Sequence, residues 1–492
     1  MHHRDSMENA VDLFIIGGGI NGAAIAADAA GRGLSVTLCD KGDLGGATSS
    51  ASSKLIHGGL RYLEQYEFTM VRKALREREI LMKRAPHLIQ PLQFILPYEK
   101  HLRAKWLIRI GLFLYDHLAK RTLLPRSRSL HLKKHILQAQ FNTGFSYYDC
   151  LTDDSRLVIA NAKSASEQGA TILNYTEFVG TTREMNYWKI ELRDTFSKKI
   201  SYCYAKVLVN AAGPWINEVQ KKINPHKQFP IQLVQGSHIV TKKLYSENHA
   251  YILQNQDGRI IFTIPFQRQF TLIGTTDHTL TTHLDNLQVG KDDIDYLCSL
   301  INFYFIKKIS PQDIIWMFSG VRCLQDHPAE NVSTLTREHK LDLTIENTLP
   351  ILTIIGGKLT THRILAEEAM QQLNSFFPKM KPAWTAHTFL PGGRLHQNNF
   401  IDFYQTLLRN KPWLPEDLAY RYAKSYGSDA YTLLKNIHSI SDLGKSFGSD
   451  LFEHEVNYLI THEWAKTTED ILWRRTKLGL LISHSVQFFH DS

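Results

Sequence analysis

Near the N-terminus, apolar and polar positions follow one another in blocks that predict a strand, a turn, a helix and a second strand. Residues 11–16 form a short apolar run, and residues 17–22 are rich in glycine. The alanine-rich segment 23–30 is typical of a buried helix, and 35–38 is typical of another strand. This order predicts a βαβ unit and therefore an α/β fold with a parallel sheet.

The turn of this unit has the spacing of a dinucleotide-binding fingerprint. Gly17, Gly19 and Gly22 follow the GxGxxG pattern, and Asp40 ends the second strand. The glycines permit a tight turn, close approach of a pyrophosphate and close helix packing. Asp40 can accept hydrogen bonds from an adenosine ribose, which disfavours NADP. A plain structural turn is the alternative, and the fingerprint does not separate NAD from FAD.

The segment after the second strand, residues 45–62, is first small and hydroxylated and then basic and aromatic. A flexible serine linker is one interpretation of such a composition. A linker would not normally continue directly into Lys54-Leu-Ile-His-Gly-Gly-Leu-Arg-Tyr and a charged helical segment. Residues 47–63 resemble the signature of FAD-dependent glycerol-3-phosphate dehydrogenases, which belong to the D-amino acid oxidase-like flavoprotein superfamily.

Further segments resemble the same family in the same order, and the similarity extends from Asp12 to about Gly479. These segments are 153–157, 209–215, 236–240, 273–277, 320–322 and 356–361. The resemblance implies FAD as the cofactor and a Rossmann-like FAD-binding domain interleaved with a mixed-sheet substrate (cap) domain. We expect the FAD-binding domain at about 11–85, 150–225 and 345–390, the cap domain at about 86–149 and 226–344, and a C-terminal helical domain at 391–492. Asp153 and Asp154 precede a helical stretch, so helix capping explains them.

Gly356-Gly357-Lys358 stand between the apolar run 351–355 and a helical segment at 359–370. A second helix N-terminus facing a ligand is expected there, with an ordinary turn and a solvated lysine as the alternative. By resemblance, this element faces the pyrimidine end of the isoalloxazine, where it would stabilise the anionic reduced flavin. The expected cofactor-binding residues are Gly17, Gly19, Asn21, Gly22, Asp40, Thr48, Ser49, Ser50, Ser53, Lys54, Ala212, Gly213, Gly357, Lys358, Leu359 and Thr360.

The resemblance also implies a substrate: sn-glycerol 3-phosphate, whose C2 alcohol is oxidised to dihydroxyacetone phosphate by hydride transfer to flavin N5. A phosphate requires fixed positive charge, which arginine supplies with a planar fork, although a single arginine is more often a surface residue. A base with a pKa near neutrality points to histidine, and both His57 and His238 lie in the resembling segments. The expected catalytic residues are His57, His238, Arg322 and Lys358, and the expected substrate-binding residues are Arg61, Tyr62, His238, Arg322 and Arg337.

Two positions depart from the commoner family pattern: Cys323 stands where proline is more usual, and His362 replaces a tyrosine. Neither removes a phosphate-binding charge, so they affect the pocket wall rather than the reaction. Rival interpretations are an oxidase of the same fold that acts on an amino acid or hydroxy acid, and a flavin-binding protein without turnover.

Length and composition limit the number of domains, the cellular compartment and the kinds of partner. A chain of 492 residues predicts two or three domains, and its five scattered cysteines fit neither a disulfide framework nor a zinc site. No metal is expected, and a reducing cytoplasm suits the cysteines. No stretch approaches the roughly 18 apolar residues of a membrane span. The net charge of +9 favours anionic partners, but no nucleic-acid reader motif is present, so no nucleic acid is expected.

The electrons of the reduced flavin must leave directly, because the sequence shows no second redox motif. Resemblance implies a quinone acceptor and a cytoplasmic enzyme bound peripherally to the inner face of the membrane. Segment 103–120 mixes apolar and aromatic residues with basic ones, which suits a helix lying on anionic lipid. A helix packed on its own core is the alternative. The C-terminal segments 402–408 and 469–481 are typical of helices and are compatible with packing, a homodimer or membrane docking.

Overall fold

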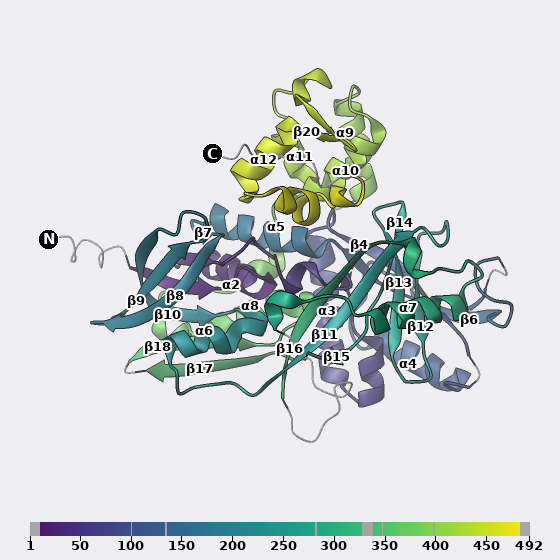
Figure 1. Cartoon of the computed structure of the whole chain (residues 1–492), viewed down its shortest axis with the longest axis horizontal. Helices are drawn as coiled ribbons and strands as arrows, with labels where there is room; N and C mark the ends of the chain where they lie inside the picture. Colours follow the sequence, from purple (N-terminus) through teal and green to yellow (C-terminus); the bar gives the residue numbers. More distant parts are fainter. Residues whose placement is uncertain are drawn as a thin grey trace.

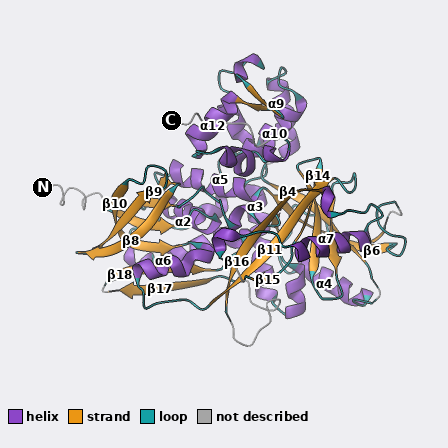
Figure 2. Cartoon of the chain, viewed as in Figure 1, coloured by secondary structure: helices purple, strands orange, loops and turns teal. Residues whose placement is uncertain are grey.

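The computed structural model of the chain describes residues 10–99, 101–132, 135–280, 283–326, 338–346, 348–396 and 399–482. Within these residues, the strands form an eight-stranded sheet (sheet A), a ten-stranded sheet (sheet B) and a two-stranded sheet. Figure 1 and Figure 2 show sheet A on the left, sheet B on the right and the C-terminal helices above them. The chain passes between the two large sheets several times, as the interleaved arrangement predicts.

Sheet A contains the predicted βαβ unit. Its centre is β1 (Val11–Ile16), which pairs in parallel with β2 (Val36–Cys39) and with β10 (Ile200–Asn210). β10 in turn pairs in parallel with β18 (Leu349–Ile355). The carboxyl ends of these four strands therefore meet at one edge, where ligands of such sheets bind. The other strands of sheet A are β7 (Thr171–Leu173), β8 (Thr176–Glu184), β9 (Tyr187–Asp194) and β17 (Lys340–Glu346).

Helix α2 (Ile20–Gly31) is buried along almost its whole length between sheet A and the helices α5 (Asp154–Glu167) and α8 (His362–Gln372). Its alanines allow this close approach, which a chain of larger side chains would prevent. Asp153 caps α5 by accepting a hydrogen bond from the backbone N–H of Arg156 at 3.2 Å, so the capping prediction is confirmed for this residue. The remaining helices beside the two sheets are α3 (Phe68–Arg84), α4 (Lys105–His117), α6 (Ile216–Ile223) and α7 (Lys291–Tyr304).

Sheet B is mixed. Its long strands β11 (Ile231–Lys242) and β16 (Ile314–Gln325) pair in antiparallel fashion and carry His238 and Arg322. β11 and β16 thus bring two predicted site residues from segments 84 positions apart to neighbouring strands. The other strands of sheet B are β3 (Leu55–Ile56), β4 (Ile89–Pro97), β5 (Arg128–His131), β6 (Thr143–Thr152), β12 (His249–Gln254), β13 (Ile260–Phe266), β14 (Phe270–Gly274) and β15 (His278–Thr279).

The C-terminal part is helical and has its own apolar core, which confirms the predicted fold class; the exact domain boundaries stay a prediction. The expected helix at 469–481 differs, because Asp470–Arg475 (η12) is a π-helix and Leu478–Leu480 is a 3-10 turn. Between them, Lys477 takes a φ of 61°, which a regular helix excludes. The other elements are α9 (Phe400–Asn410), α10 (Glu416–Tyr426), α11 (Ala430–Leu433), α12 (Glu453–Glu463), β19 (Ser446–Gly448) and β20 (Leu451–Phe452).

Candidate active site

The glycine turn after β1 leaves no room for side chains. Gly17 has a φ of 112°, and a Cβ on it would lie 2.5 Å from the carbonyl oxygen of Ala211. A Cβ on Gly22 would lie 1.9 Å from the carbonyl oxygen of Gly17. At the start of α2, the N–H of Ile20 donates to Ser49 Oγ at 3.0 Å. The backbone of this turn can therefore approach a ligand closely.

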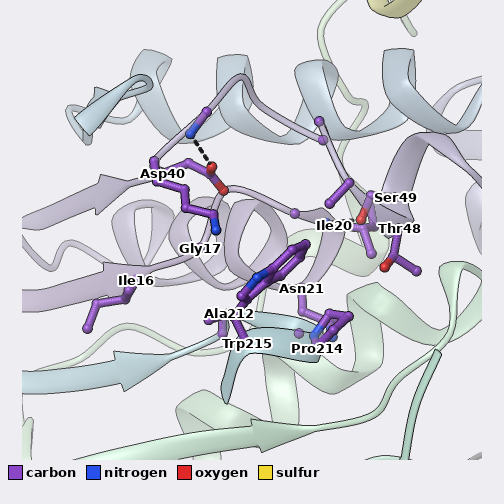
Figure 3. Close-up of a pocket in the computed structure, with 18 of the residues that line it drawn as sticks. Ile16, Gly17, Ile20, Asn21, Asp40, Thr48, Ser49, Ala212, Pro214 and Trp215 are labelled. Atoms are coloured by element: carbon purple, nitrogen blue, oxygen red, sulfur yellow. Dashed lines mark hydrogen bonds between the residues drawn. The ribbon is translucent and has the colours of Figure 1, made fainter. Parts of the chain in front are cut away.

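A cavity of about 520 Å³, here called the glycine cavity, lies along the carboxyl ends of the parallel strands. Figure 3 shows Asp40 on one side of this cavity, Thr48 and Ser49 on the other, and Trp215 between them. Ten of the expected cofactor-binding residues line it: Gly17, Gly19, Asn21, Asp40, Thr48, Ser49, Ala212, Gly213, Gly357 and Lys358. The other six are not among its lining residues: Gly22, Ser50, Ser53, Lys54, Leu359 and Thr360.

Asp40 shapes the end of the cavity next to β2. Its Oδ2 accepts a hydrogen bond from the N–H of Gly18 at 2.7 Å, and its Oδ1 accepts one from Gly42 at 2.8 Å. Burial raises the pKa of Asp40, whereas these two bonds act in the opposite direction. Each carboxylate oxygen has a second lone pair, so Asp40 keeps the capacity to accept a hydrogen bond from a ribose hydroxyl.

Lys54 points away from the glycine cavity. Its ammonium donates to Asp154 Oδ1 at 2.8 Å and Oδ2 at 2.9 Å, and its side chain is 1% exposed. Thr360 holds the neighbouring segment, since its Oγ1 accepts a hydrogen bond from the backbone N–H of His57 at 3.1 Å. Lys54 and Thr360 therefore fix the shape of residues 50–58 in the structure rather than form the cavity wall.

At the other end of the cavity, two glycine turns are joined. Asn21 Nδ2 donates to the carbonyl oxygen of Gly356 at 3.0 Å, and Gly357 has a φ of 102°. The Lys358 ammonium lies 4.2 Å from the centroid of the Tyr62 ring. The predicted second turn therefore reaches the glycine cavity and places a positive charge beside the segment that contains His57, Arg61 and Tyr62.

A second, smaller space of about 90 Å³, here called the histidine cavity, is lined by His57, Arg61, Tyr62 and Asp277. Asp277 Oδ1 lies 2.6 Å from Arg322 Nη2, and Arg322 lines the glycine cavity. This ion pair therefore stands where the two spaces adjoin. Of the expected catalytic and substrate-binding residues, His57, Arg61 and Tyr62 line the histidine cavity, and Arg322 and Lys358 line the glycine cavity. His238 is not among the lining residues of either cavity. Arg337 and residues 1–6 lie outside the described residues.

His238 is buried on β11, opposite Phe318 of β16. Its Nε2 lies 2.9 Å from Ser53 Oγ, and its ring stacks on Phe318 with 4.9 Å between the centroids. Burial, followed by the charges of Lys54 and Arg322, lowers the pKa of His238 to about 3. Its Nδ1 has no hydrogen-bond partner among the described residues. His238 is therefore a neutral imidazole at neutral pH.

A buried network supports the turn that follows His57. The N–H of Gly58 donates to the hydroxyl of Tyr115 at 2.8 Å, and that hydroxyl donates to Asp149 at 2.7 Å. Arg78 Nη1 donates to Asp149 Oδ1 at 2.5 Å. Burial and the charge of Asp149 raise the pKa of Tyr115 well above its ordinary value, so the hydroxyl keeps its proton. Sequence reasoning did not assign these three side chains to the site.

Other residues of the site were also missed. Trp215 and Asp277 lie within segments that carried the family resemblance, so a signal was available for them. The Lys41 ammonium lies 4.6 Å from the centroid of a Trp215 ring. Arg474 lines the glycine cavity from the C-terminal domain, and no motif in the sequence marked it.

The glycine turn, the acid after β2 and the cavity at the strand ends define a dinucleotide-binding protein of the α/β class. The family model for FAD-dependent oxidoreductases matches residues 12–362. A second model, the C-terminal domain of alpha-glycerophosphate oxidase, matches residues 383–490. The chain therefore belongs to the family of FAD-dependent oxidoreductases, and its cofactor is FAD. The predicted family and the predicted cofactor are both confirmed.

Two relatives and a solved structure extend this result. The chain is 48% identical to a glycerol-3-phosphate dehydrogenase of Pseudomonas aeruginosa, over 97% of this chain and 93% of the relative. It is 45% identical to a D-erythritol 1-phosphate dehydrogenase of Brucella abortus, over 95% and 94% of the two chains. The solved glycerol-3-phosphate dehydrogenase of Bacillus halodurans, complexed with FAD, superposes with a TM-score of 0.75 at 26% identity. The match covers 96% of this chain and 87% of the solved chain.

Proposed function

We propose that this chain oxidises sn-glycerol 3-phosphate to dihydroxyacetone phosphate. The observation that supports this function best is the arrangement of three cations around the junction of the two cavities. Arg322 and Lys358 line the glycine cavity, and Arg61 lines the histidine cavity beside His57. Guanidinium and ammonium groups around one small space suit a phosphate monoester whose alcohol lies next to a base.

The residues of the glycine cavity fit FAD. The side-chain-free turn at Gly17 to Gly22 and the start of α2 would hold the pyrophosphate, and Asp40 would hold the adenosine ribose. Gly357 and Lys358 would hold the far end of the cofactor, where a positive charge favours the reduced form. We assign Ser50, Ser53, Lys54 and Thr360 an indirect part, because they shape the segment that forms one wall.

The oxidation removes a hydride from C2 and a proton from the attached oxygen, and a ketone remains. FAD, when bound, accepts the hydride. The proton requires a base, and we propose His57, which lines the histidine cavity. Burial and two neighbouring cations oppose protonation of His238, so this residue is better suited to position the substrate as a neutral imidazole. The phosphate would be bound by Arg322 and Arg61, with Tyr62 beside them. We also propose this role for Arg337, which lies outside the described residues.

The test is anaerobic mixing of the purified flavoprotein with glycerol 3-phosphate while the visible flavin absorbance is followed. We expect the absorbance to bleach with glycerol 3-phosphate and to persist with glycerol or with D-amino acids. Bleaching by an amino acid or a hydroxy acid, but not by glycerol 3-phosphate, would establish the rival oxidase function. Persistence of the absorbance with every candidate substrate would establish a flavin-binding protein without turnover.

D-Erythritol 1-phosphate is a second candidate substrate, because a relative of nearly equal similarity is named for it. It shares the phosphate monoester and the secondary alcohol but has a longer carbon chain. The ratio of kcat/KM for the two phosphates decides between them. We expect glycerol 3-phosphate to be preferred, because the relative at 48% identity is named for it.

We further propose that a membrane quinone reoxidises the flavin and that the enzyme docks on the anionic inner face of the cytoplasmic membrane. Helix α4 supports this, since Trp106 and Phe113 are 65% and 60% exposed on it, beside the exposed Lys105 and Arg109. No helix among the described residues is long and apolar enough to cross a bilayer. A homodimer remains a separate prediction, which the mass of the protein in solution tests.

Vesicle flotation tests the docking proposal. Trp106→Glu/Phe113→Glu is expected to abolish binding to vesicles that contain anionic lipid, while dye-linked turnover stays within about twofold of the parent. The matched control is Phe196→Glu, which changes a similarly exposed aromatic residue between β9 and β10. Equal loss of binding in both variants, or none in the first, would show that α4 is not the docking surface.

A further inference from the structure

The C-terminal domain reaches the glycine cavity through the π-helix η12. Ile471 and Leu472 of this turn are fully buried in the apolar core of the C-terminal domain. Arg474 and Arg475 leave the same turn toward the loop 41–47, which follows β2. π-Helical turns are rare and frequently occur at functional sites, so this departure from the regular helix points to a function for the contact.

Both arginines bind one carboxylate, that of Asp43. Arg475 donates from Nη1 to Oδ2 at 2.5 Å and from Nη2 to Oδ1 at 2.9 Å, which is a bidentate pair. Arg474 donates from Nε to Oδ2 at 2.5 Å. The side chains of Asp43 and Arg475 are both 0% exposed. These ion pairs, here called the Asp43 contact, join positions 431 and 432 residues apart in the sequence.

The loop that contains Asp43 forms part of the cavity wall. Gly42, Asp43, Gly45 and Gly46 all line the glycine cavity. On its inner side, the loop is tied to the glycine turn, because the N–H of Gly45 donates to the carbonyl oxygen of Gly18 at 2.9 Å. The Asp43 contact ties the outer side to the C-terminal domain, so the loop is held from both sides.

The same π-helix also touches sheet B. Trp473 stacks on Trp316 of β16 with 4.5 Å between the ring centroids, and β16 carries Arg322. Arg474 itself lines the glycine cavity. One turn of the C-terminal domain therefore contacts the cofactor loop and the strand that bears a proposed substrate residue.

We propose that the C-terminal domain retains FAD: Arg474 and Arg475 act as positioning residues that hold the loop 41–47, through Asp43, in its cofactor-binding conformation. This loop has three glycines among its seven residues, so it has much conformational freedom to lose. If the loop is already ordered in the free protein, FAD binding does not have to supply that ordering free energy. Loss of the Asp43 contact then weakens FAD binding and speeds FAD release. This inference rests on FAD as the cofactor and is independent of the proposed substrate.

The test uses the full-length double variant Asp43→Asn/Arg475→Met. This change removes the bidentate pair but leaves no unpaired arginine, because Arg474 keeps hydrogen bonds to Glu469 and Asp470. We expect the Kd for FAD, measured by flavin fluorescence during titration of the apoprotein, to rise about tenfold or more. The melting temperature of the apoprotein is measured beside it, so that weaker binding is separated from general destabilisation.

The matched control is Arg156→Met/Glu463→Gln. It removes another buried ion pair between α5 and the C-terminal domain, and neither residue lines the glycine cavity. We expect its Kd for FAD to stay within about threefold of the parent even where its melting temperature falls. An unchanged Kd in the Asp43 variant, or an equal rise in both variants, overturns the proposal.

A milder variant covers the outcome in which the Asp43 double variant does not fold. Arg474→Gln keeps the bidentate pair between Arg475 and Asp43. We expect FAD to dissociate about threefold or more faster from this variant than from the parent, at a similar melting temperature. A dissociation rate equal to that of the parent overturns the proposal.

Discussion

At the cofactor end of the site, the groups that face the cavity are mostly backbone, and their placement depends on the absence of side chains at Gly17 and Gly22. At the substrate end, the groups are side chains, held by the Arg322 to Asp277 ion pair and by the hydroxyl of Tyr115. Substitutions at the two ends should therefore have different kinds of effect. Steric exclusion gives all-or-none effects, whereas hydrogen bonds and ion pairs give graded ones.

The largest expected effect is at the cofactor end. Gly22→Ala places a Cβ 1.9 Å from the carbonyl oxygen of Gly17, a contact that only movement of α2 or of the glycine turn can relieve. We expect the purified variant to retain almost no FAD, which the ratio of flavin absorbance to protein absorbance measures. Gly180→Ala is the control, because a Cβ there meets nothing within 4 Å. Normal flavin content in Gly22→Ala would show that the turn is not sterically limited.

Removal of the charge at the substrate end should be large but graded. We expect Arg322→Ala to lower kcat/KM for glycerol 3-phosphate by about two to three orders of magnitude, since a phosphate contact to arginine is lost while Asp277 remains. The flavin content should stay near that of the parent. Arg322→Lys keeps the charge without the planar fork, so its kcat/KM should lie between that of the parent and that of Arg322→Ala. Loss of flavin in parallel with activity would show that Arg322 supports cofactor binding, and the proposed difference between the cofactor end and the substrate end would then fail.

A smaller effect is expected where a single hydroxyl supports the substrate end. Tyr115→Phe removes the hydrogen bond to Gly58, whose N–H then has only Asp149 Oδ1 at 3.4 Å. We expect kcat/KM to fall about tenfold, in line with about 1–3 kcal/mol for an unsatisfied buried group. The control is Tyr304→Phe, which removes a buried hydroxyl that donates to the carbonyl oxygen of Gln254. An equal fall of kcat/KM in both variants would show that the Tyr115 hydroxyl contributes only to stability.

The same contrast explains how much of the molecule was predictable from the sequence. The glycine turn, α2 and Asp40 lie within one stretch of chain, so local spacing predicted their contacts. The Arg322 to Asp277 pair joins β16 to the connection between β14 and β15, and only family resemblance marked its segments. The Asp43 contact joins positions more than 400 residues apart, and nothing in the periodicity of either segment indicates the other. Tertiary packing alone decides such contacts.

The smallest expected effect is a change in pH dependence, and it concerns the charge state of the substrate end. The folded-state pKa of His238 is about 3, below its ordinary value of 6.5. Between these values the unfolded chain binds more protons than the folded protein, so this residue adds stability above pH 6.5 that is lost as the pH falls toward 3. His238→Gln removes that contribution. The melting temperature of the variant should therefore depend less steeply on pH across this window than that of the parent.

His362 supplies the comparison, because burial lowers its pKa to about 3 as well, but its Nδ1 lies 2.7 Å from the carbonyl oxygen of Leu359, beside the second glycine turn. His362→Gln should flatten the same pH profile while kcat/KM stays close to that of the parent. His238→Gln should flatten the profile and also lower kcat/KM, because its imidazole faces Ser53 in the wall beside Arg322. An unchanged pH profile in His238→Gln would mean that folding does not lower the pKa of His238, and the argument that favours His57 as the base would then fail.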